Sequence, residues 1–257
     1  MLYRVTNITT FLLLAGLLCL HNLWQPVAWW IFAVLLVVYT LLLVWGSMDI
    51  AAGFYMPVTC SVQTRQKVVA LTFDDGPLRD FTPQVLDILQ AHKVPAAFFC
   101  IGKNIPGNAA ILQRAHEEGH LLGNHSYTHH FWFDLFGPAR MLAELRQTDD
   151  AVQQVTGLRP RFFRPPYGVT NPNLKKAVQR GGYFPLGWNI RSLDTVIKEE
   201  SPLLERITSQ LKPGSIILLH DSAAVTVQVL PALIAYLHNS GYTIERVDKM
   251  LNIPAYA

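Results

Sequence analysis

Two adjacent carboxylates, Asp74 and Asp75, follow an apolar run in the stretch VVALTFDDGP, residues 68–77 of this 257-residue chain. Like charges this close raise each other's pKa unless a neighbouring group neutralises one of them. A solvated acidic turn would account for the pair without any chemistry. A metal site that uses one carboxylate and leaves the other free would give both a role, and Gly76-Pro77 would turn the backbone sharply enough to aim both inward.

The stretch HSYTHH places His125 and His129 four residues apart, which on a helix would put both imidazoles on one face. An isolated pair of this kind is more often two surface histidines, and His130 is either a bystander or a substitute ligand. Together with Asp75, the pair gives two histidines and one carboxylate, a set that leaves open coordination positions as catalytic metal sites do. Zinc is the first candidate for this triad, and iron, cobalt, nickel and manganese are alternatives.

With Asp75 assigned to the metal, Asp74 remains a free carboxylate that can act as general base on water. Its natural partner is Arg164 of the segment RPPYG, which can form a bidentate pair with a carboxylate. Pro165 and Pro166 lack N–H groups, so the next donor is the Tyr167 amide, which could point at a developing oxyanion. Taken alone, the segment would be an ordinary turn with a surface arginine.

His220 ends the apolar run SIILLH and is expected to act as general acid toward a leaving amine, provided that a carboxylate raises its pKa. Asp194 is the candidate carboxylate. Asp221 is adjacent, but its side chain should point the other way, so we expect a structural role for it. The remaining histidines are interpreted as structural: His21, His92, His116 and His120.

Short apolar runs alternate with amphipathic segments from residue 67 onward, and this alternation must position the motifs. The runs predict strands at 68–73, 96–101, 121–124, 161–164, 184–188, 215–220 and 242–246, and the segments predict helices at 83–92, 108–118, 139–156, 171–180, from 201, and 227–239. About seven such units indicate an α/β fold with a mostly parallel sheet that closes, or nearly closes, a barrel. Because functional groups in such folds lie at the carboxyl ends of the strands, the motifs are expected on one rim.

In this order, the motifs TFDDGP, HSYTHH, RPPYG, SLD and LLH resemble those of the NodB-homology polysaccharide deacetylases, carbohydrate esterase family 4, over residues 67–257. The resemblance implies a deformed (β/α) barrel that removes N-acetyl groups from amino sugars with a divalent metal ion. Motif by motif, it implies that the base is Asp74, the metal ligands are Asp75, His125 and His129, the arginine orienting the base is Arg164, the oxyanion donor is the Tyr167 amide, and the acid is His220, tuned by Asp194.

The segment RSLDT, residues 191–195, departs from the family pattern DSxDW. Arg191 replaces the first aspartate, and Thr195 replaces the tryptophan that normally shapes the substrate pocket. His130 is also additional to the pattern. The resemblance therefore leaves the particular sugar and its chain length open.

The N-terminal region is apolar, with no Asp, Glu, Lys or Arg between residues 8 and 45. Two blocks, 8–20 and 27–45, predict a membrane-spanning helical hairpin, since about 20 apolar residues cross a bilayer. The alternative for the first block is a cleaved signal peptide, but only Arg4 precedes it and no small-x-small cleavage site follows. The expected organisation is a membrane anchor at 1–46, a connector at 47–66 and a NodB-like domain at 67–257.

Composition limits the classes of partner. A net charge of +3 is too small and too scattered to indicate nucleic-acid binding, whereas 51% hydrophobic residues and a mean hydropathy of +0.23 fit an anchored protein. The three cysteines, Cys19, Cys60 and Cys100, suggest neither a disulfide framework nor a cysteine metal site.

The expected function is metal-dependent removal of N-acetyl groups from a polysaccharide or cell-envelope glycan, with the domain on the extracytoplasmic side, where the family's usual substrates lie. One alternative is deacylation of a lipid-linked sugar at the membrane surface. Two others are a membrane-tethered carbohydrate-binding protein without catalysis and a metal store.

Overall fold

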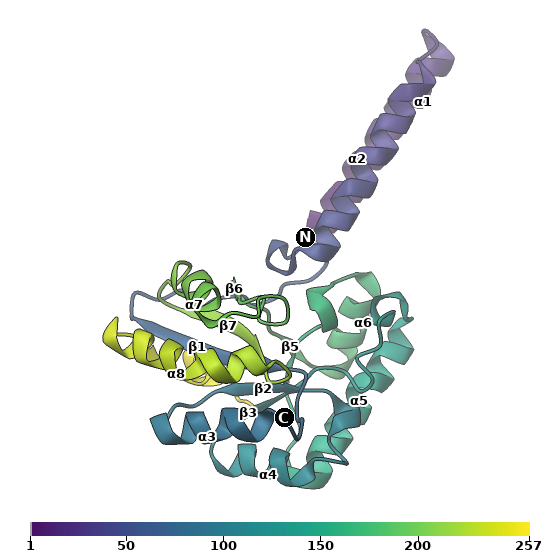
Figure 1. Cartoon of the computed structure of the whole chain (residues 1–257). Helices are drawn as coiled ribbons and strands as arrows, with labels where there is room; N and C mark the ends of the chain where they lie inside the picture. The colour runs from purple at the N-terminus through teal and green to yellow at the C-terminus, as the bar shows by residue number, and fades with distance from the viewer. Residues whose placement is uncertain (1) are drawn as a thin grey trace.

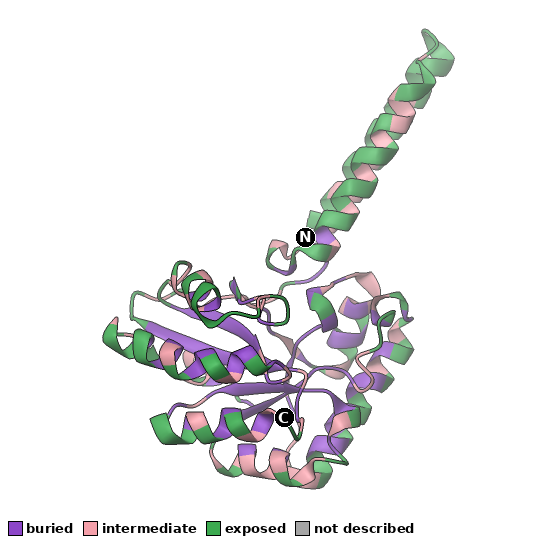
Figure 2. Ribbon diagram, in the orientation of Figure 1, coloured by how far each residue is buried: buried purple, intermediate pink, exposed green. Residues whose placement is uncertain are grey.

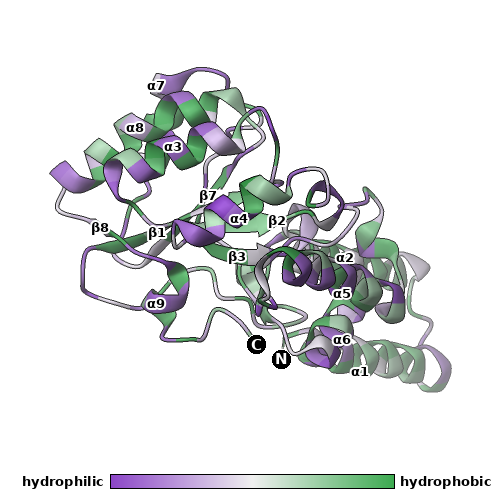
Figure 3. Cartoon of the chain, turned by 90° about the horizontal axis from the view of Figure 1, so that it is seen from below, coloured by the Kyte–Doolittle hydropathy of each residue, from purple (hydrophilic) through white to green (hydrophobic). Residues whose placement is uncertain are grey.

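A helical hairpin projects from an α/β domain in the computed structural model, which describes residues 2–257 (Figure 1). The hairpin consists of α1 (Leu2–Leu23) and α2 (Trp29–Met48), joined midway by a 3.0 Å hydrogen bond from the Tyr39 hydroxyl to the Asn7 side chain. Figure 2 shows exposed and intermediate residues along almost all of it, and Figure 3 shows that it is largely hydrophobic. Both helices are long and apolar enough to cross a membrane.

Eight strands form one parallel sheet in the order β5-β4-β3-β2-β1-β7-β6, with β8 paired to β1. The strands are β1 (Val68–Asp74), β2 (Ala97–Cys100), β3 (Leu121–Asn124), β4 (Phe162–Phe163), β5 (Phe184–Pro185), β6 (Ile190–Arg191), β7 (Ser215–His220) and β8 (Thr243–Ile244). Every residue of β1 is buried, as expected for a central strand covered on both faces. The curled parallel sheet with its helices confirms the predicted deformed (β/α) barrel.

Helices follow most strands and cover the sheet: α3 (Thr82–His92), α4 (Ala109–Glu117), α5 (Pro138–Thr156), α6 (Pro172–Gly181), α7 (Glu200–Thr208), α8 (Ala224–Asn239) and α9 (Val247–Leu251). The helix predicted at 171–180 is present as α6 and is bounded by its own residues. The Asn171 side chain accepts a 2.8 Å bond from the Leu174 N–H, Pro172 starts the helix, and Gly182 ends it at a φ of 73°. Short 3₁₀ turns lie at η1 (Ile50–Ala52), η2 (Gly102–Asn104), η3 (Phe133–Leu135) and η4 (Pro166–Gly168).

The barrel is open between its edge strands β5 and β6, and the connector crosses this opening. Thr59 pairs with the segment after β5, and Ser61 pairs with Ser215 of β7. Gly214 makes the crossing feasible, because a Cβ there would lie only 1.8 Å from the Val62 carbonyl oxygen. Part of the connector is therefore fastened to the sheet rather than free.

The predicted strand at 184–188 ends early, because β5 contains only Phe184 and Pro185. After β5 the chain crosses to the opposite edge of the sheet, where β6 pairs with β7. This short β6, and α9 after β8, are elements that the sequence pattern did not predict.

Candidate active site

The predicted site residues meet at the carboxyl ends of the strands. A cavity of about 190 Å³ lies there, lined by Asp74, Asp75, His125, His129, Pro165, Tyr167, Gly168, Trp188, Arg191, Thr195, Leu218 and His220. The strand register explains the convergence: Asp74 lies opposite His220 in the β1–β7 pair, and Cys100 lies opposite Asn124 in the β2–β3 pair. Arg164 and Asp194 are fully buried beside this cavity.

The two carboxylates at the end of β1 have different partners. Asp74 is buried and accepts a 2.7 Å bond from Arg164 Nη1. Asp75 has a φ of 84° and accepts a 3.2 Å bond from the Ser222 hydroxyl. The next residue must be glycine, because a Cβ on Gly76 would lie 2.0 Å from an oxygen of the buried Asp221 carboxylate.

Arg164 fixes Asp74 through a buried network. Its Nη1 also donates to the Thr72 hydroxyl at 2.9 Å, while Nε and Nη2 donate to the carbonyl oxygens of Leu186 and Gly187 at 3.3 and 3.0 Å. The pair with Asp74 is thus single rather than bidentate, because backbone carbonyls occupy the other donors. Burial lowers the pKa of Arg164 and the Asp74 charge opposes this, so the guanidinium remains charged.

His125 and His129 lie on a loop after β3, not on a helix, so the helical-face argument for their spacing is wrong. Ser126 and His129 have φ values of 65° and 47°, which no α-helix contains. Side chains shape this loop: Asn124 Oδ1 accepts from the Ser126 N–H at 2.9 Å, and the Ser126 hydroxyl accepts from the His129 N–H at 3.1 Å. The two imidazole rings nevertheless come within 4.8 Å, centroid to centroid.

Helix α5 supports the same loop from outside. The buried Glu144 carboxylate accepts a 2.7 Å bond from the Thr128 N–H and further bonds from the Thr128 hydroxyl. The Asn124 amide donates to Asp149 at 2.8 Å. Sequence reasoning missed these residues. The available signal was that Glu144, Thr148 and Asp149 fall on the inner face of an amphipathic helix, where polar residues need partners.

The donor set of Asp75, His125 and His129 fits a divalent metal ion. One ligand atom from each lies within 4.8 Å of the others. The Arg164 carbonyl oxygen lies 2.8 Å from His125 Nδ1, which places the ring proton there and leaves Nε2 free as a ligand. Burial, with the adjacent His125, lowers the pKa of His129 to about 4, so this imidazole is neutral, as metal ligation requires.

His130 is not part of the triad. Its Nδ1 accepts a 3.0 Å bond from the Trp132 N–H, and its ring packs on Phe136. The sequence left two roles open for His130, a bystander or a substitute ligand. This geometry agrees with a bystander.

His220 and Asp194 form a close pair. Asp194 Oδ1 lies 2.7 Å from His220 Nδ1, while Oδ2 accepts from the His220 N–H and the Thr226 hydroxyl at 2.7 and 2.6 Å. Burial alone would lower the pKa of His220, but the hydrogen bond to Asp194 and the Asp194 charge, with the charges of Asp74 and Asp75, outweigh this and raise the pKa to about 9. The imidazole therefore carries a proton that it can donate at neutral pH.

Backbone strain gathers around the same cavity. Tyr167, whose ring lies 4.7 Å from that of His129, has a φ of 58°. Among residues 2–257, seven non-glycine residues have a positive φ, and five of them are on this rim: Asp75, Ser126, His129, Tyr167 and Leu193. Such conformations cost about 1–3 kcal/mol each and concentrate at functional sites.

Asp221 lies beneath the Gly76 turn, and its carboxylate accepts a 2.7 Å bond from the Thr82 hydroxyl. Burial raises its pKa to about 7. Its side chain does not line the cavity of the triad, as expected for a structural residue.

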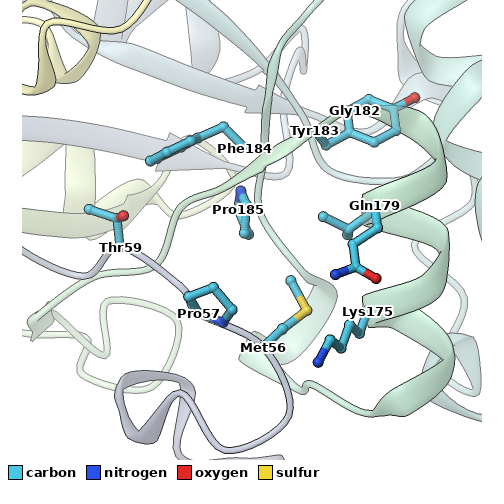
Figure 4. Close-up of a pocket in the computed structure, with 10 residues that line it drawn as sticks. Met56, Pro57, Thr59, Lys175, Gln179, Gly182, Tyr183, Phe184 and Pro185 are labelled. Carbon is cyan, nitrogen blue, oxygen red and sulfur yellow. The ribbon is translucent and has the colours of Figure 1, made fainter. Parts of the chain in front are cut away.

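A second cavity, of about 380 Å³, separates the connector from α6 (Figure 4). Met56, Pro57 and Thr59 form one wall, and Lys175 and Gln179 are on the other. Its lining, drawn from residues 2–257, offers no carboxylate, histidine or cysteine. The reactive groups are concentrated in the strand-end cavity instead.

Comparisons with known proteins agree with this geometry. The family model for polysaccharide deacetylases matches residues 61–186. The peptidoglycan-N-acetylmuramic acid deacetylase PdaA of Bacillus subtilis is 31% identical over 192 residues, which are 73% of each chain. The structure of the Bc1960 peptidoglycan N-acetylglucosamine deacetylase is similar with a TM-score of 0.73 and 29% identity, over 78% of this chain and 95% of that one.

A pseudoenzyme has the same fold. This CE4 family protein from Bacillus anthracis is similar with a TM-score of 0.68 and 26% identity, over 73% of this chain and 66% of its own. Fold alone therefore does not establish catalysis. Sequence and structure together show that this chain belongs to the polysaccharide deacetylase family, carbohydrate esterase family 4.

Proposed function

We propose that this protein removes N-acetyl groups from amino sugars of a cell-envelope glycan. The observation that carries the proposal is the arrangement of one cavity: Asp74 lies beside the metal-ligand triad, and the protonated His220 faces it from the next strand. Each of these two groups has its own buried partner, Arg164 or Asp194. The general base and the general acid are thus positioned by separate partners, as amide hydrolysis requires.

Asp75, His125 and His129 would hold the divalent ion. When bound, the ion supplies Lewis-acid activation of water and of the acetamide carbonyl. Asp74 accepts the proton of the attacking water, and its charge-assisted bond to Arg164 keeps the carboxylate oriented for this transfer. Two histidine nitrogens and a carboxylate oxygen make zinc our first choice.

Tyr167 and His220 carry out the remaining steps. The Tyr167 N–H follows two prolines on a tight turn and donates to the oxyanion that forms when water adds to the carbonyl. His220 then donates its proton to the sugar nitrogen as the C–N bond breaks, so that acetate and a free amine leave. No covalent enzyme intermediate is required by this sequence of steps.

The chief rival is a carbohydrate-binding protein without turnover, since a pseudoenzyme shares the fold. A glycan-binding surface needs neither a buried Arg164–Asp74 pair nor a carboxylate that holds a proton on His220. The presence of both pairs in this chain favours catalysis. A metal store is disfavoured for the same reason.

We further propose that residues 1–46 anchor the protein in a membrane and that residues 67–257 form an extracytoplasmic deacetylase domain. Residues 47–66 connect the two. The exposed apolar hairpin supports the anchor. The named relatives act on peptidoglycan, a cell-envelope glycan, which supports the location of the domain. The Tyr3 N–H donates to the Phe54 carbonyl at 3.1 Å, so both ends of the hairpin lie beside the domain, as a two-span anchor would place them.

Acetate release from N-acetylglucosamine oligomers tests the function. The full chain, purified in detergent and loaded with zinc, should release acetate, and a chelator should abolish release. Asp74→Asn should retain zinc and glycan binding but lose release. Release that persists in Asp74→Asn would contradict the proposed base, and glycan binding without release by the metal-loaded wild type would favour the binding protein.

A further inference from the structure

The end of the second hairpin helix is fastened directly to the wall of the active site. The Thr170 N–H donates to the Ser47 carbonyl at 3.0 Å, and the Thr170 hydroxyl donates to the Gly46 carbonyl at 3.4 Å. Thr170 is buried and follows Tyr167 by three residues, which span at most about 11 Å. The cavity therefore has no free linker that could carry it away from α2.

The position of the bilayer follows from α2. Its 20 residues extend about 30 Å, the thickness of the hydrocarbon core. With α2 spanning the membrane, Ser47 lies at the boundary between lipid and water. Trp45, whose surface is 48% exposed, lies at this end, where tryptophan is favoured. The Tyr167 wall of the cavity thus lies at the membrane surface.

An apolar loop extends this contact from the anchor to the cavity. Phe131, Trp132 and Leu135 are 66%, 55% and 68% exposed. Leu135 lines a groove of about 560 Å³ whose other wall includes Leu43, Val44 and Met48 of α2, and the Phe131 ring lies 6.2 Å from that of Tyr167. An apolar patch continuous with a membrane helix fits the bilayer interface, where aromatic side chains are favourable.

The cavity also contains a cation without a carboxylate partner. Arg191 is among the residues that line it, and no carboxylate within residues 2–257 lies at ion-pair distance from its guanidinium. Arg191 stands where the family pattern has an aspartate. Arginine binds phosphate well through paired N–H groups. An anionic substituent on the sugar would satisfy it.

We propose that the substrate is an N-acetylated amino sugar joined through phosphate to a membrane lipid. The bilayer presents the sugar to the cavity, the loop of Phe131, Trp132 and Leu135 sits in the interface, and Arg191 binds the phosphate. This inference rests on the proposed deacetylase function and specifies its substrate class.

Three substrates test it with the full-length, zinc-loaded protein in nanodiscs, the two lipids being placed in the same nanodiscs and the oligomer added to the solution. They are a soluble N-acetylglucosamine oligomer, a neutral glycolipid with N-acetylglucosamine glycosidically attached to a long-chain alcohol, and the same sugar attached through phosphate. Acetate release should be most efficient from the phosphate-linked lipid, by at least about tenfold over the neutral one, as expected for one charge-assisted contact.

Two variants separate the contributions. The preference is the ratio of kcat/KM for the phosphate-linked glycolipid to kcat/KM for the neutral glycolipid. Arg191→Gln should reduce this ratio by about tenfold. The double variant Trp132→Ser with Leu135→Ser should reduce the preference for both lipids over the soluble oligomer, by about tenfold, because the loop beside the cavity then no longer inserts into the interface where the lipid presents its sugar. Tyr236→Ser is the matched control: Tyr236 is 43% exposed on α8, a helix that lies away from the hairpin (Figures 1 and 3).

The outcomes are distinguishable. Efficient release from the soluble oligomer with no preference for either lipid would overturn this inference and leave the deacetylase function intact. Equal rates on the two lipids would overturn the role of Arg191 and the phosphate. No release from any of the three substrates, with zinc bound, would count against the deacetylase function itself. Thermal melting of each variant checks that lost activity is not lost folding.

Discussion

At the scale of single residues, opposing influences decide whether His220 can act as an acid. Burial favours the neutral imidazole, while the Asp194 hydrogen bond and charge favour the cation and prevail. Asp194 is itself fixed by the Thr226 hydroxyl and the His220 N–H, so it cannot rotate away. The protonated form of His220 therefore depends mainly on its pairing with Asp194.

Asp194→Asn should move the alkaline limb of the pH–activity profile to lower pH. The acid works only while protonated, so wild-type kcat/KM should fall as pH rises through about 9, the pKa of His220. Without the Asp194 charge, burial prevails and the limb should move to about 6.5 or below, the ordinary histidine range. The pH profile of acetate release measures this.

Asp87→Asn serves as the control for that profile. Asp87 is an exposed carboxylate on α3 that pairs with Arg114, far from the cavity lining. The alkaline limb of the Asp87→Asn variant should coincide with that of the wild type. An unchanged limb in Asp194→Asn would show that another group supplies the proton.

Metal affinity should distinguish His129 from the adjacent His130. His129→Ala removes one of the three proposed ligands and should weaken zinc binding by more than about 100-fold, since even loss of an outer hydrogen-bond partner costs 10–100-fold. His130→Ala should leave affinity unchanged, because its ring faces Phe136. Calorimetric titration with zinc is the measurement. Similar losses in both variants would mean that the triad is assigned incorrectly.

The sequence predicted which residues meet but not how the histidines meet. The positions of Asp74, His220 and Arg164 followed from motifs at strand ends, and the structure places all three at one rim. The spacing of His125 and His129 suggested a helix, because periodicity carries no information on side-chain bonds that bend a loop. Those bonds depend on tertiary contacts, which no local pattern encodes.

At the scale of elements, α5 holds the histidine loop in place. Glu144 is the contact, since its buried carboxylate accepts the Thr128 N–H and hydroxyl. Glu144→Ala should weaken zinc binding by about 10–100-fold by releasing the loop, although Glu144 is not a ligand. Calorimetric titration tests this as well.

Asp150→Ala is the matched control for Glu144, because Asp150 is an exposed acid on the same helix. It should bind zinc as the wild type does. If Glu144→Ala also binds zinc normally, the loop is held by Asn124 and Ser126 alone.

The elements were predictable in proportion to their length. Long apolar runs gave β1 and β7 to within one residue, and the capping residues of α6 fixed its bounds closely. Strand β6 was missed because two residues show no periodicity, and its pairing depends on the distant β7. The opening of the barrel was not predictable for the same reason, because it follows from the crossing of the chain between β5 and β6.

At the scale of the whole molecule, the central relation is between the N-terminal hairpin, our proposed membrane anchor, and the cavity. Gly46 is the only buried residue of α2, and Phe54 packs against it closely enough that a Cβ on Gly46 would lie 2.3 Å from the ring. This contact lets the last turn of α2 approach Thr170. Composition predicted the anchor, but nothing in the sequence predicted that its last turn would bind the Tyr167 segment.

Gly46→Val should therefore detach the domain from the anchor without preventing membrane insertion. The valine forces Phe54 or the helix end to move, so the Thr170 N–H loses the Ser47 carbonyl and should exchange at least about tenfold faster with deuterium. Gly16→Val is the control, because no atom lies within 4 Å of a Cβ at that position. Hydrogen exchange of the full chain in nanodiscs measures both. If the Thr170 amide in Gly46→Val is as protected as in Gly16→Val, the domain is held by its other contacts, and the membrane-surface position of the cavity does not depend on the last turn of α2.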